Sequence, residues 1–496
     1  MIFNSYIFIL FFLPSLILGY FVLNKISTFC GKLFIILMSI IFYLYNGSSI
    51  MAILGISIVI NYISACFIGK LKAINFSIYP PPTASKLRVN FILIISMLIN
   101  VIILFYFKYF NFFISTINHA LKKDFTTQNI ILPLGISFFT FQQIMYLINV
   151  YKGTIEQIDI FDYLAYILYF PKLIMGPLVE PADLISQINN IERKSVNWDN
   201  ISNGLKIFSF GLFKKMIFAD TFSDAVNWGY SNIGTATSME WLVIMLCYTF
   251  EIYFDFSGYC DMAVGISTML NITLPINFDS PYKALSIREF WRKWHISLTN
   301  FLTKYVYIPL GGNKKGKLRT YINTLLVFCV SGIWHGANWT FILWGILHGF
   351  LSISDRMLEN IQKKVFEPVR WICTFFAVNV LWLLFRSNSV SQWILILKII
   401  FKFENTSVSD EFLNEFGLPE FSFINNEPHL GSLYSTVRGF SLILFIFSAF
   451  FICLVPENNY RNLTKNNWIY MVVSAIAFVW GFLCISTESV FVYSNF

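Results

Sequence analysis

Two histidines stand where they could carry acid–base chemistry. His295 lies in the stretch FWRKWHISL and His335 in SGIWHGANW, and each directly follows a tryptophan. Imidazole titrates near neutral pH, so it is the side chain that most often serves as a general base. His335 ends an apolar stretch between Gly332 and Gly336, and burial at membrane depth favours the neutral ring that a base needs. We predict that His335 is such a base; the alternative is a neutral histidine that bridges two helices.

The other histidines carry weaker signals. His295 falls at the edge of an apolar helix stripe, where it either looks into a cavity or bonds to a neighbouring carbonyl. His348 follows His335 by 13 residues, about 20 Å along an unbroken helix, so one site holds both only if the helix breaks. We interpret His348 as structural or as part of a mouth on the opposite side. His119 and His429 are predicted in loops.

Three carboxylates lie within one apolar stretch, TFEIYFDFSGYCDMAVG: Glu251, Asp255 and Asp261. The first two are four residues apart and share a helix face, where like charges repel unless one is protonated or a cation lies near. We predict that they orient a histidine or line a polar tunnel. The alternative is pairing with a lysine at the same depth, namely Lys172, Lys214 or Lys215.

Metal and phosphate chemistry are not indicated. The eight cysteines lie singly, without a C-x-x-C pair or clustered histidines, so neither a zinc site nor a disulfide scaffold is predicted. GGNKKGK (311–317) matches the first seven positions of a phosphate-binding loop, but Leu318 replaces the required Ser or Thr. We interpret this loop as a basic cytoplasmic turn that attracts anionic lipid headgroups or an acidic partner.

Residues 286–305 are predicted to form the amphipathic helix that carries His295. Ser286 and Glu289 make the capping box S-x-x-E at its start. Its apolar stripe is expected to lie on the membrane and its basic side to face water. Together with the basic turn, the helix offers positive side chains for an anionic ligand: Arg288, Arg292, Lys293, Lys314, Lys315 and Lys317.

The composition is that of an integral membrane protein. Hydrophobic residues make up 56% of the 496 residues and charged residues only 12%, against about a quarter in soluble proteins. Nucleic-acid binding is thereby disfavoured. Apolar runs predict an all-α, polytopic chain with roughly 11 to 13 crossings or re-entrant helices. The expected spans are 6–23, 33–46, 50–68, 90–110, 131–150, 162–179, 204–221, 238–256, 318–334, 337–352, 369–385, 433–455 and 467–485.

Loop charges predict the orientation, because short basic loops stay in the cytoplasm. Residues 283–319 carry nine Lys or Arg against one Glu, and the loop 69–89 is basic as well, so both are placed in the cytoplasm. Six acidic residues and no base predict an extracellular acidic loop over 404–431. Prolines and a glycine in 169–181 predict a re-entrant or broken helix. A single integral-membrane domain over 1–496 is expected.

Seven stretches, in order, resemble the membrane-bound O-acyltransferase family. They are LPLGISFFTFQ (132–142), YFPKLIMGPLVE (169–180), YFDFSGYCDMAVG (253–265), NFDSPY (277–282), SIREFWRKWHISL (286–298), YIPLGG (307–312) and WHGANWTFILWGILHG (334–349). They cover most of residues 130–350, the expected catalytic core. Two histidines forty residues apart, in W-H-I-S and W-H-G, are the most specific part. The chain resembles the bacterial branch of the family. Within that branch it is most similar to the membrane subunit of alginate and polysaccharide O-acetylation and less similar to the teichoic acid D-alanyltransferase.

This resemblance implies a ring of helices around a central tunnel, with His335 as the active-site base and His295 as its companion on the cytoplasmic side. It implies an O-acyltransferase that moves an acyl group, acetyl above all, to a cell-surface or exported polysaccharide. The donor is expected to be a cytoplasmic thioester, acetyl-CoA or an acyl-carrier protein, which is a substrate, so no bound cofactor is predicted. Tunnel-lining or orienting candidates are Asn338, Trp334, Trp294, Asp255, Asp261 and Glu251.

The remaining expectations concern partners and alternatives. The basic side chains named above are predicted to dock the donor, and a separate extracellular esterase-like acyltransferase is expected to complete transfer to the polymer. Membrane lipids are expected to surround the protein, nucleic acid is not an expected partner, and the bacterial inner membrane is the expected location. Alternatives are D-alanyl transfer to teichoic acid, a lipid acyltransferase, and a non-enzymatic transporter or flippase; the last is disfavoured because the chain shows no internal repeat.

Overall fold

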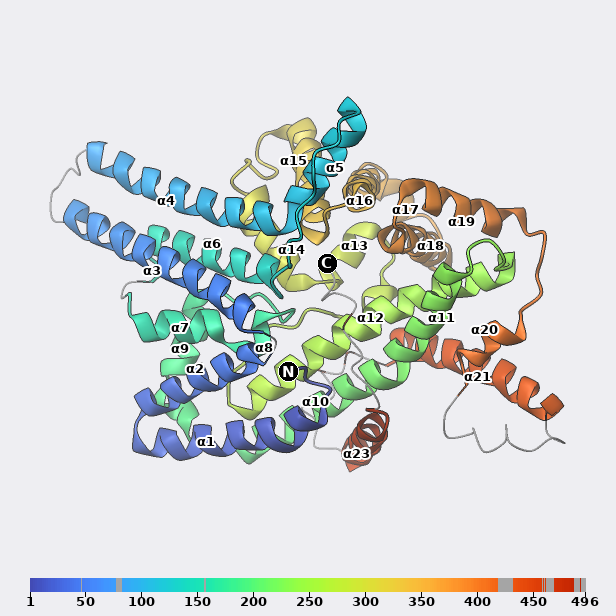
Figure 1. The fold of residues 1–496 in the computed structure, drawn as a ribbon, viewed down its shortest axis with the longest axis horizontal. Coiled ribbons are helices and arrows are strands. Elements are labelled where there is room, and N and C mark those ends of the chain that lie inside the picture. The colour runs from blue at the N-terminus through green and yellow to red at the C-terminus, as the bar shows by residue number, and fades with distance from the viewer. Residues whose placement is uncertain are drawn as a thin grey trace. The chain divides into compact units, whose positions relative to one another are not determined.

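The computed structural model describes residues 1–45, 47–76, 83–155, 158–417, 431–456, 458, 460, 468–485 and 491. Throughout these ranges the regular structure is helical, with no β-strand (Figure 1), as predicted. The chain divides into two compact units, each with its own buried core. The first holds residues 1–208 and 260–275, and the second holds 209–259 and 276–496.

The first unit consists of apolar helices that contact one another through apolar side chains and a few buried polar groups. Its elements are η1 (Phe8–Phe12), α1 (Leu13–Ile26), α2 (Thr28–Leu44), α3 (Ser48–Phe76), α4 (Thr83–Leu104), η2 (Phe105–Tyr109), α5 (Phe110–Leu121), α6 (Ile136–Lys152), α7 (Ile160–Leu168), α8 (Phe170–Leu173), α9 (Pro181–Asn189), η3 (Ile191–Lys194) and most of α10 (Trp198–Phe213). Helix α1 packs on α2, and α3 and α4 pack on each other and on α6 (Figure 1).

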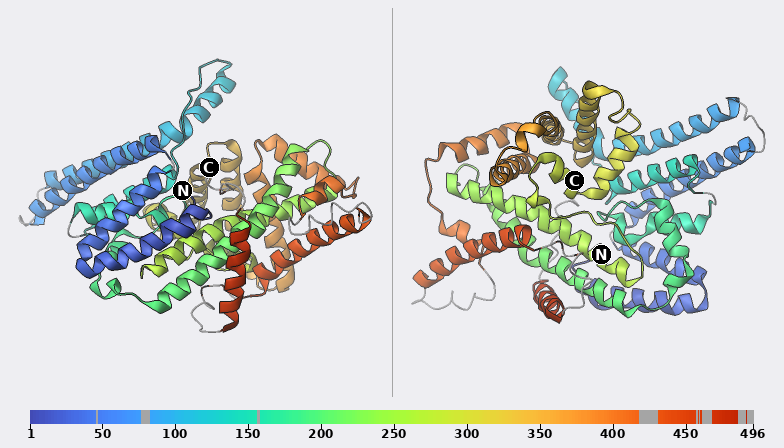
Figure 2. Two further views of the ribbon diagram at one scale, coloured as in Figure 1. Left: turned by 60° about the horizontal axis from the view of Figure 1, so that its bottom comes forward. Right: turned by 180° about the vertical axis from the view of Figure 1, so that it is seen from behind.

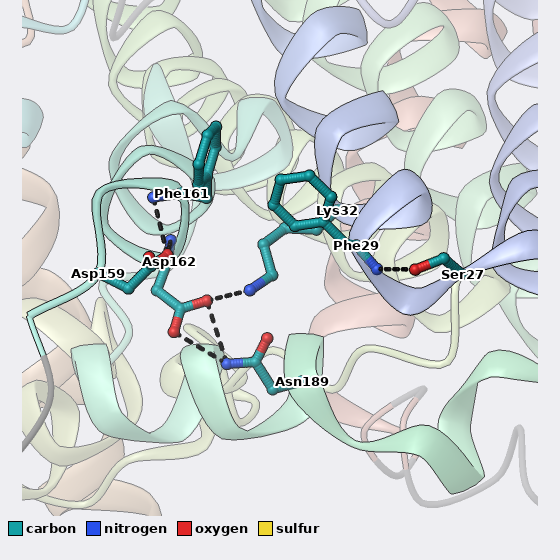
Figure 3. Close-up of polar contacts among 7 residues, drawn as sticks. All are labelled: Ser27, Phe29, Lys32, Asp159, Phe161, Asp162 and Asn189. Carbon is teal, nitrogen blue, oxygen red and sulfur yellow. Dashed lines mark hydrogen bonds and ion pairs between the residues drawn. The ribbon is translucent and has the colours of Figure 1, made fainter.

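A carboxylate links three helices of this unit (Figure 3). Lys32 of α2 forms an ion pair with Asp162 of α7, and the Asn189 amide of α9 donates to both oxygens of the same carboxylate, at 3.1 and 3.0 Å. One turn earlier, the Asp159 carboxylate caps α7 by accepting from the N–H groups of residues 161 and 162, each at 2.9 Å. The pairing joins α2, α7 and α9 through side chains.

The chain between α7 and α9 is broken, as predicted for residues 169–181. Helix α7 ends at Leu168, Tyr169 leaves the helical region (φ −52°, ψ 98°), and α8 lasts only four residues. Lys172 of α8 is fully buried; its Nζ donates to Gln142 of α6 and lies 3.9 Å from the Tyr166 ring centroid. Irregular backbone at such depth is tolerated because protein groups surround it.

The second unit carries His295, His335 and His348. Its elements are the end of α10, η4 (Lys214–Ala219), α11 (Asp220–Ser231), most of α12 (Ser238–Met269), η5 (Pro281–Lys283), α13 (Ile287–Lys293), α14 (Ile296–Leu302), η6 (Thr303–Tyr307), α15 (Gly316–His335), α16 (Trp339–Met357), α17 (Glu359–Gln362), α18 (Glu367–Arg386), α19 (Val390–Lys402), α20 (Asp410–Asn414), α21 (Gly431–Leu454) and α23 (Trp468–Leu483). Helix α16 packs on α15, α18 and α13 (Figure 2).

Helices α15 and α16 form a hairpin whose close contact requires glycine. A Cβ atom on Gly332 would lie 2.4 Å from the carbonyl oxygen of Phe341, and one on Gly345 would lie 2.3 Å from that of Phe328. Small residues allow two helix backbones to approach in a membrane, where dispersion contacts drive association. This contact holds His335, the last residue of α15, next to α16.

Each of the thirteen expected spans contains a described helix. Four helical stretches are long and apolar enough to cross a bilayer, Phe8–Ile26, Met51–Ala73, Leu87–Leu121 and Glu367–Arg386, and three shorter apolar helices are Thr28–Leu44, Arg438–Leu454 and Trp468–Leu483. Other expected spans are more polar because they pack within protein: α6 is buried along most of its length. The chain is an integral membrane protein, while the central tunnel stays a prediction.

Some boundaries differ from the prediction. His119 lies within α5 rather than in a loop. The expected acidic loop includes a short helix, α20, and its residues 418–430, with His429, lie outside the described part of the chain. Helix α19, with residues 390–402, was not predicted. Its buried face consists only of Ile396 and Ile400, too short an apolar pattern to identify it as a span.

Candidate active site

The helix expected over 286–305 is broken at His295, so the prediction of one continuous helix is wrong. Helix α13 ends at Lys293 and α14 begins at Ile296. Between them Trp294 is extended (φ −104°, ψ 130°) and His295 adopts a left-handed backbone (φ 44°, ψ 53°). A left-handed conformation is uncommon for a residue with a Cβ atom and clusters at functional sites.

Hydrogen bonds from a distant segment stabilise this break. The Ile296 N–H donates to the Asn277 carbonyl at 3.0 Å, and the Ser297 N–H donates to Asn277 Oδ1 at 3.1 Å. The Asp279 N–H donates in turn to the Lys293 carbonyl at 3.0 Å. These partners replace bonds that a continuous helix would make. Asn277 is thus a positioning residue that sequence reasoning missed; its only signal was its place in NFDSPY.

The start of α13 follows the predicted capping box. Ser286 Oγ accepts from the Glu289 N–H at 3.2 Å, and Glu289 Oε2 accepts from the N–H of Leu285, one residue before the expected partner, at 2.9 Å. Burial tends to raise the pKa of Glu289, but its bonds to Lys293 and to the Leu285 N–H outweigh burial and lower it. The cap fixes the direction in which the chain enters the site.

The apolar face of α13 packs on protein, which corrects the expectation that it lies on the membrane. Trp291 packs edge-on against the rings of Trp344 and His348, with centroids 5.5 and 5.0 Å away. Phe290 packs against Trp382 of α18 at 6.3 Å. An apolar helix stripe buries itself equally well in lipid or in a protein core, so periodicity could not choose between them.

His335 is held with its Nε2 as the proton-accepting atom. The residue is 3% exposed, and its Nδ1 donates to the carbonyl oxygen of Ser331, one turn earlier in α15, at 2.6 Å. A carbonyl oxygen only accepts, so the proton of the neutral ring is on Nδ1 and the lone pair is on Nε2. This is the tautomer that a general base acting through Nε2 requires.

The two predicted histidines lie near the same indole. The Trp334 ring centroid is 6.1 Å from that of His295 and 5.0 Å from that of His335. On its other side His295 meets the edge of Phe256 at 4.8 Å. The second unit thus brings the rings of His295 and His335 to the same indole, that of Trp334.

His348 also belongs to this neighbourhood. The helix breaks after His335 and α16 folds back, so Trp344 packs against both His335 (5.0 Å) and His348 (4.8 Å). The 13-residue separation therefore does not keep the two histidines apart. Trp291 Nε1 donates to His348 Nδ1 at 3.2 Å, a contact that fits the structural interpretation of this residue.

Asn338 serves as a helix cap. Its Oδ1 accepts from the Thr340 N–H at 3.1 Å, and its Nδ2 donates to the carbonyl of Asn388 at 2.9 Å. The amide oxygen and one N–H of Nδ2 are thereby engaged, and the expected role of Asn338 in steadying a substrate carbonyl stays a prediction. Trp294, another tunnel candidate, packs on Trp382 with centroids 4.9 Å apart.

For Asp255 the lysine-pairing alternative holds. Its carboxylate lies 2.7 Å from Lys215 Nζ, which also pairs with Asp220 at 2.9 Å. Glu251, one turn before it on α12, is 3% exposed. Asp261 belongs to the first unit, and its predicted place beside the histidines stays a prediction. Within the described ranges, no group of three His, Cys, Asp or Glu is arranged to hold a metal ion.

The predicted docking residues divide into two sets. Arg288 pairs with Glu359 at 3.2 Å and Lys293 with Glu289 at 2.8 Å, so their charges are partly compensated. Three lysines and one arginine are exposed instead: Lys314, Lys315, Lys317 and Arg292. The turn before α15 carries two glycines with positive φ, at 311 and 312, and Gly316, the first residue of α15, has a positive φ as well. This turn is the stronger candidate for an anionic ligand.

Comparisons with known proteins give the family. Residues 85–391 match the model of the membrane-bound O-acyltransferase family. The whole chain is 35% identical to the peptidoglycan O-acetyltransferase of Helicobacter pylori, covering 98% of it. It is 37% identical to a probable alginate O-acetylase of Pseudomonas syringae, over 79% of this chain and 73% of that protein. Over 49% of this chain and 61% of the relative, it is 30% identical to the teichoic acid D-alanyltransferase of Streptococcus thermophilus. The chain, with its paired histidines in one unit, therefore belongs to the membrane-bound O-acyltransferase family and is an O-acyltransferase.

Proposed function

We propose that the protein moves an acetyl group from a cytoplasmic thioester, acetyl-CoA or an acyl-carrier protein, to hydroxyl groups of a polymer outside the inner membrane. The polymer class that the relatives' names support is peptidoglycan or an exported polysaccharide. The observation that carries the proposal is the geometry of His335, whose Nδ1 is bonded to the Ser331 carbonyl so that Nε2 accepts the proton.

The proposed reaction is an acyl transfer that requires neither a metal ion nor a redox group. His335 Nε2 accepts the proton of the acceptor hydroxyl while the hydroxyl oxygen forms a bond to the thioester carbonyl carbon. The carbon–sulfur bond then breaks, and the imidazolium returns the proton to the departing thiolate, so the products are an ester and a thiol. General-base catalysis of this kind contributes roughly 10² to 10⁴ in rate.

His295 is proposed as the companion on the cytoplasmic side. It is buried, it shares the Trp334 ring with His335, and its left-handed backbone is stabilised by hydrogen bonds to Asn277. A strained residue persists only where its surroundings determine it. We assign it to positioning the thioester next to His335.

The donor is proposed to dock on the basic turn before α15. Lys314 and Lys315 lie in this turn and Lys317 lies in the first turn of α15; all three are exposed, where they would attract the phosphates of CoA or an acidic carrier protein. Only the acyl group needs to cross the membrane. We further propose that a separate extracellular esterase-like protein completes the transfer to the polymer.

The test of the proposed function is the His335→Gln variant. Glutamine keeps an amide near the Ser331 carbonyl but cannot accept a proton, so the ester content of the cell-surface polymer and thiol release from the donor should fall at least 10²-fold. His119→Gln, an exposed position in α5, is the matched control with normal activity. Near-normal ester content in His335→Gln, at equal membrane expression, would contradict the mechanism.

A further inference from the structure

Four buried N–H groups near His335 have no hydrogen-bond acceptor among the residues that the structure describes. They are the indole Nε1 atoms of Trp294, Trp344 and Trp382 and the Nε2 atom of His348. Each of these residues is 0% exposed. Buried donors are paired in the great majority of cases, so four unpaired donors in one neighbourhood point to a ligand.

The tautomer of His348 follows from its partner. Trp291 Nε1 can only donate, so His348 Nδ1, at 3.2 Å, must accept. The neutral ring therefore carries its proton on Nε2, the atom without a partner. His348 consequently offers a donor, and not an acceptor, to whatever lies beside it.

The four residues form one cluster, which we call the indole cluster. Trp344 packs on His348 at 4.8 Å and on Trp382 at 5.8 Å, and Trp382 packs on Trp294 at 4.9 Å. Trp344 also contacts His335 at 5.0 Å. Three elements of the second unit supply them: α16, α18 and the break after α13.

Other tryptophans of the same unit show that unpaired indoles are not the rule here. Trp371 Nε1 donates to the Tyr282 carbonyl at 2.8 Å, and Trp393 Nε1 donates to the Val380 carbonyl at 3.1 Å. One further indole, Trp241, lacks an acceptor, but its ring packs on Tyr230, outside the cluster. Among the described indoles of this unit, three of the four buried ones without an acceptor belong to the cluster.

We propose that the indole cluster binds the carbonyl oxygens of the acyl-thioester donor, with Trp344 and His348 donating to the oxygen of the thioester carbonyl that the acceptor hydroxyl attacks. The inference rests on the proposed function and names a binding role for residues outside the histidine pair. The cluster offers only hydrogen-bond donors, so it is complementary to an atom that can only accept hydrogen bonds. A carbonyl oxygen is such an atom. Donors placed where negative charge develops stabilise the transition state.

The probe is acetonyl-CoA, a stable ketone that replaces the reactive thioester, labelled with ¹³C at its carbonyl. Infrared difference spectra of the full-length protein in nanodiscs should show the carbonyl stretch at lower wavenumber than in water. In Trp344→Phe, which keeps an aromatic ring but removes the N–H, the stretch should move back. The kcat should fall about 10²-fold, as for the loss of one oxyanion donor, with a smaller change in KM.

Matched controls are Trp371→Phe and Trp393→Phe, which remove indoles bonded to backbone carbonyls and should leave the carbonyl stretch unchanged. A measurement on the unsubstituted protein avoids dependence on the folding of variants. With ¹⁵N-labelled tryptophan, adding acetonyl-CoA should shift the indole N–H resonances of the cluster and leave those of Trp371 and Trp393 in place.

Two results are distinguishable. If acetonyl-CoA binds but its carbonyl stretch and the cluster indole resonances do not shift, or if Trp344→Phe keeps wild-type kcat, the inference is overturned while the proposed function stands. If neither acetonyl-CoA nor acetyl-CoA binds the wild-type protein, the CoA donor of the proposed function fails and the inference fails with it.

Discussion

Replacing Gly332 with alanine tests whether the α15–α16 contact sets the position of the base. The added Cβ would lie 2.4 Å from the Phe341 carbonyl oxygen, whereas ordinary contacts begin at 3.4 Å. The two helices must therefore separate by about 1 Å at this point. His335 is three residues further along α15, so it moves relative to Trp344 and the rest of α16.

The expected effect is larger on rate than on stability. Overpacking costs about 1–3 kcal/mol, of which the better helix propensity of alanine returns about 1 kcal/mol, so net destabilisation is at most about 2 kcal/mol. A displacement of about 1 Å in an active site can lower the rate roughly 10²-fold. We expect a variant that inserts and folds but has a kcat reduced about 10²-fold.

The assay follows thiol release from the acyl donor, with thermal unfolding of the same sample measured by tryptophan fluorescence. Gly439→Ala in α21 is the matched control, because a Cβ there meets nothing within 4 Å and should leave kcat unchanged. A Gly332→Ala protein with wild-type kcat would refute the reasoning that the glycine contact positions the base.

Three further predictions address the surroundings of the site. Changing Lys314, Lys315 and Lys317 together to Glu should raise the KM for an anionic donor roughly tenfold at low salt with little change in kcat, and the effect should fade as salt is added. Lys122→Glu with Lys123→Glu serves as the control, and an unchanged KM would exclude docking at the turn. Asn277→Ala leaves the Ser297 N–H without its acceptor, so stability should fall by about 1–3 kcal/mol and kcat should fall with it; Asn277→Asp, which keeps the acceptor, should restore both if the bond positions His295. Folding lowers the pKa of Glu289. Its carboxylate therefore stabilises the folded protein at pH values above the ordinary pKa of 4.5. This stabilisation is lost as the pH falls through the lower pKa of the folded state. Glu289→Gln should therefore be less stable than wild type at neutral pH, and the difference in unfolding free energy should disappear in acid. A difference that does not change with pH would contradict a stabilising role of the Glu289 carboxylate.

The sequence predicted those features that depend on composition and local pattern. The helical class, the capping box of Ser286 and Glu289 and the broken segment near Lys172 all follow from residue type and spacing. The family motifs also predicted that His295 and His335 belong together. Their shared contact with Trp334 is consistent with that.

What the sequence could not predict depends on contacts between distant segments. The break at His295 contains neither glycine nor proline, and it forms because Asn277 offers competing hydrogen bonds. The return of α16 brings His348 close to Trp344, which linear spacing could not indicate. Asp255 pairs with Lys215 because η4 packs beside α12, and the sequence alone does not reveal this packing.

The anchor of His335 is a main-chain oxygen, that of Ser331. Because every amino acid supplies this oxygen, mutation of position 331 does not abolish the tautomer preference as long as the helix persists. A peptide carbonyl also contributes a dipole rather than a full negative charge, so it stabilises the protonated ring less than an aspartate would. In the proposed mechanism the imidazolium is therefore weakly stabilised, and it returns its proton readily to the departing thiolate.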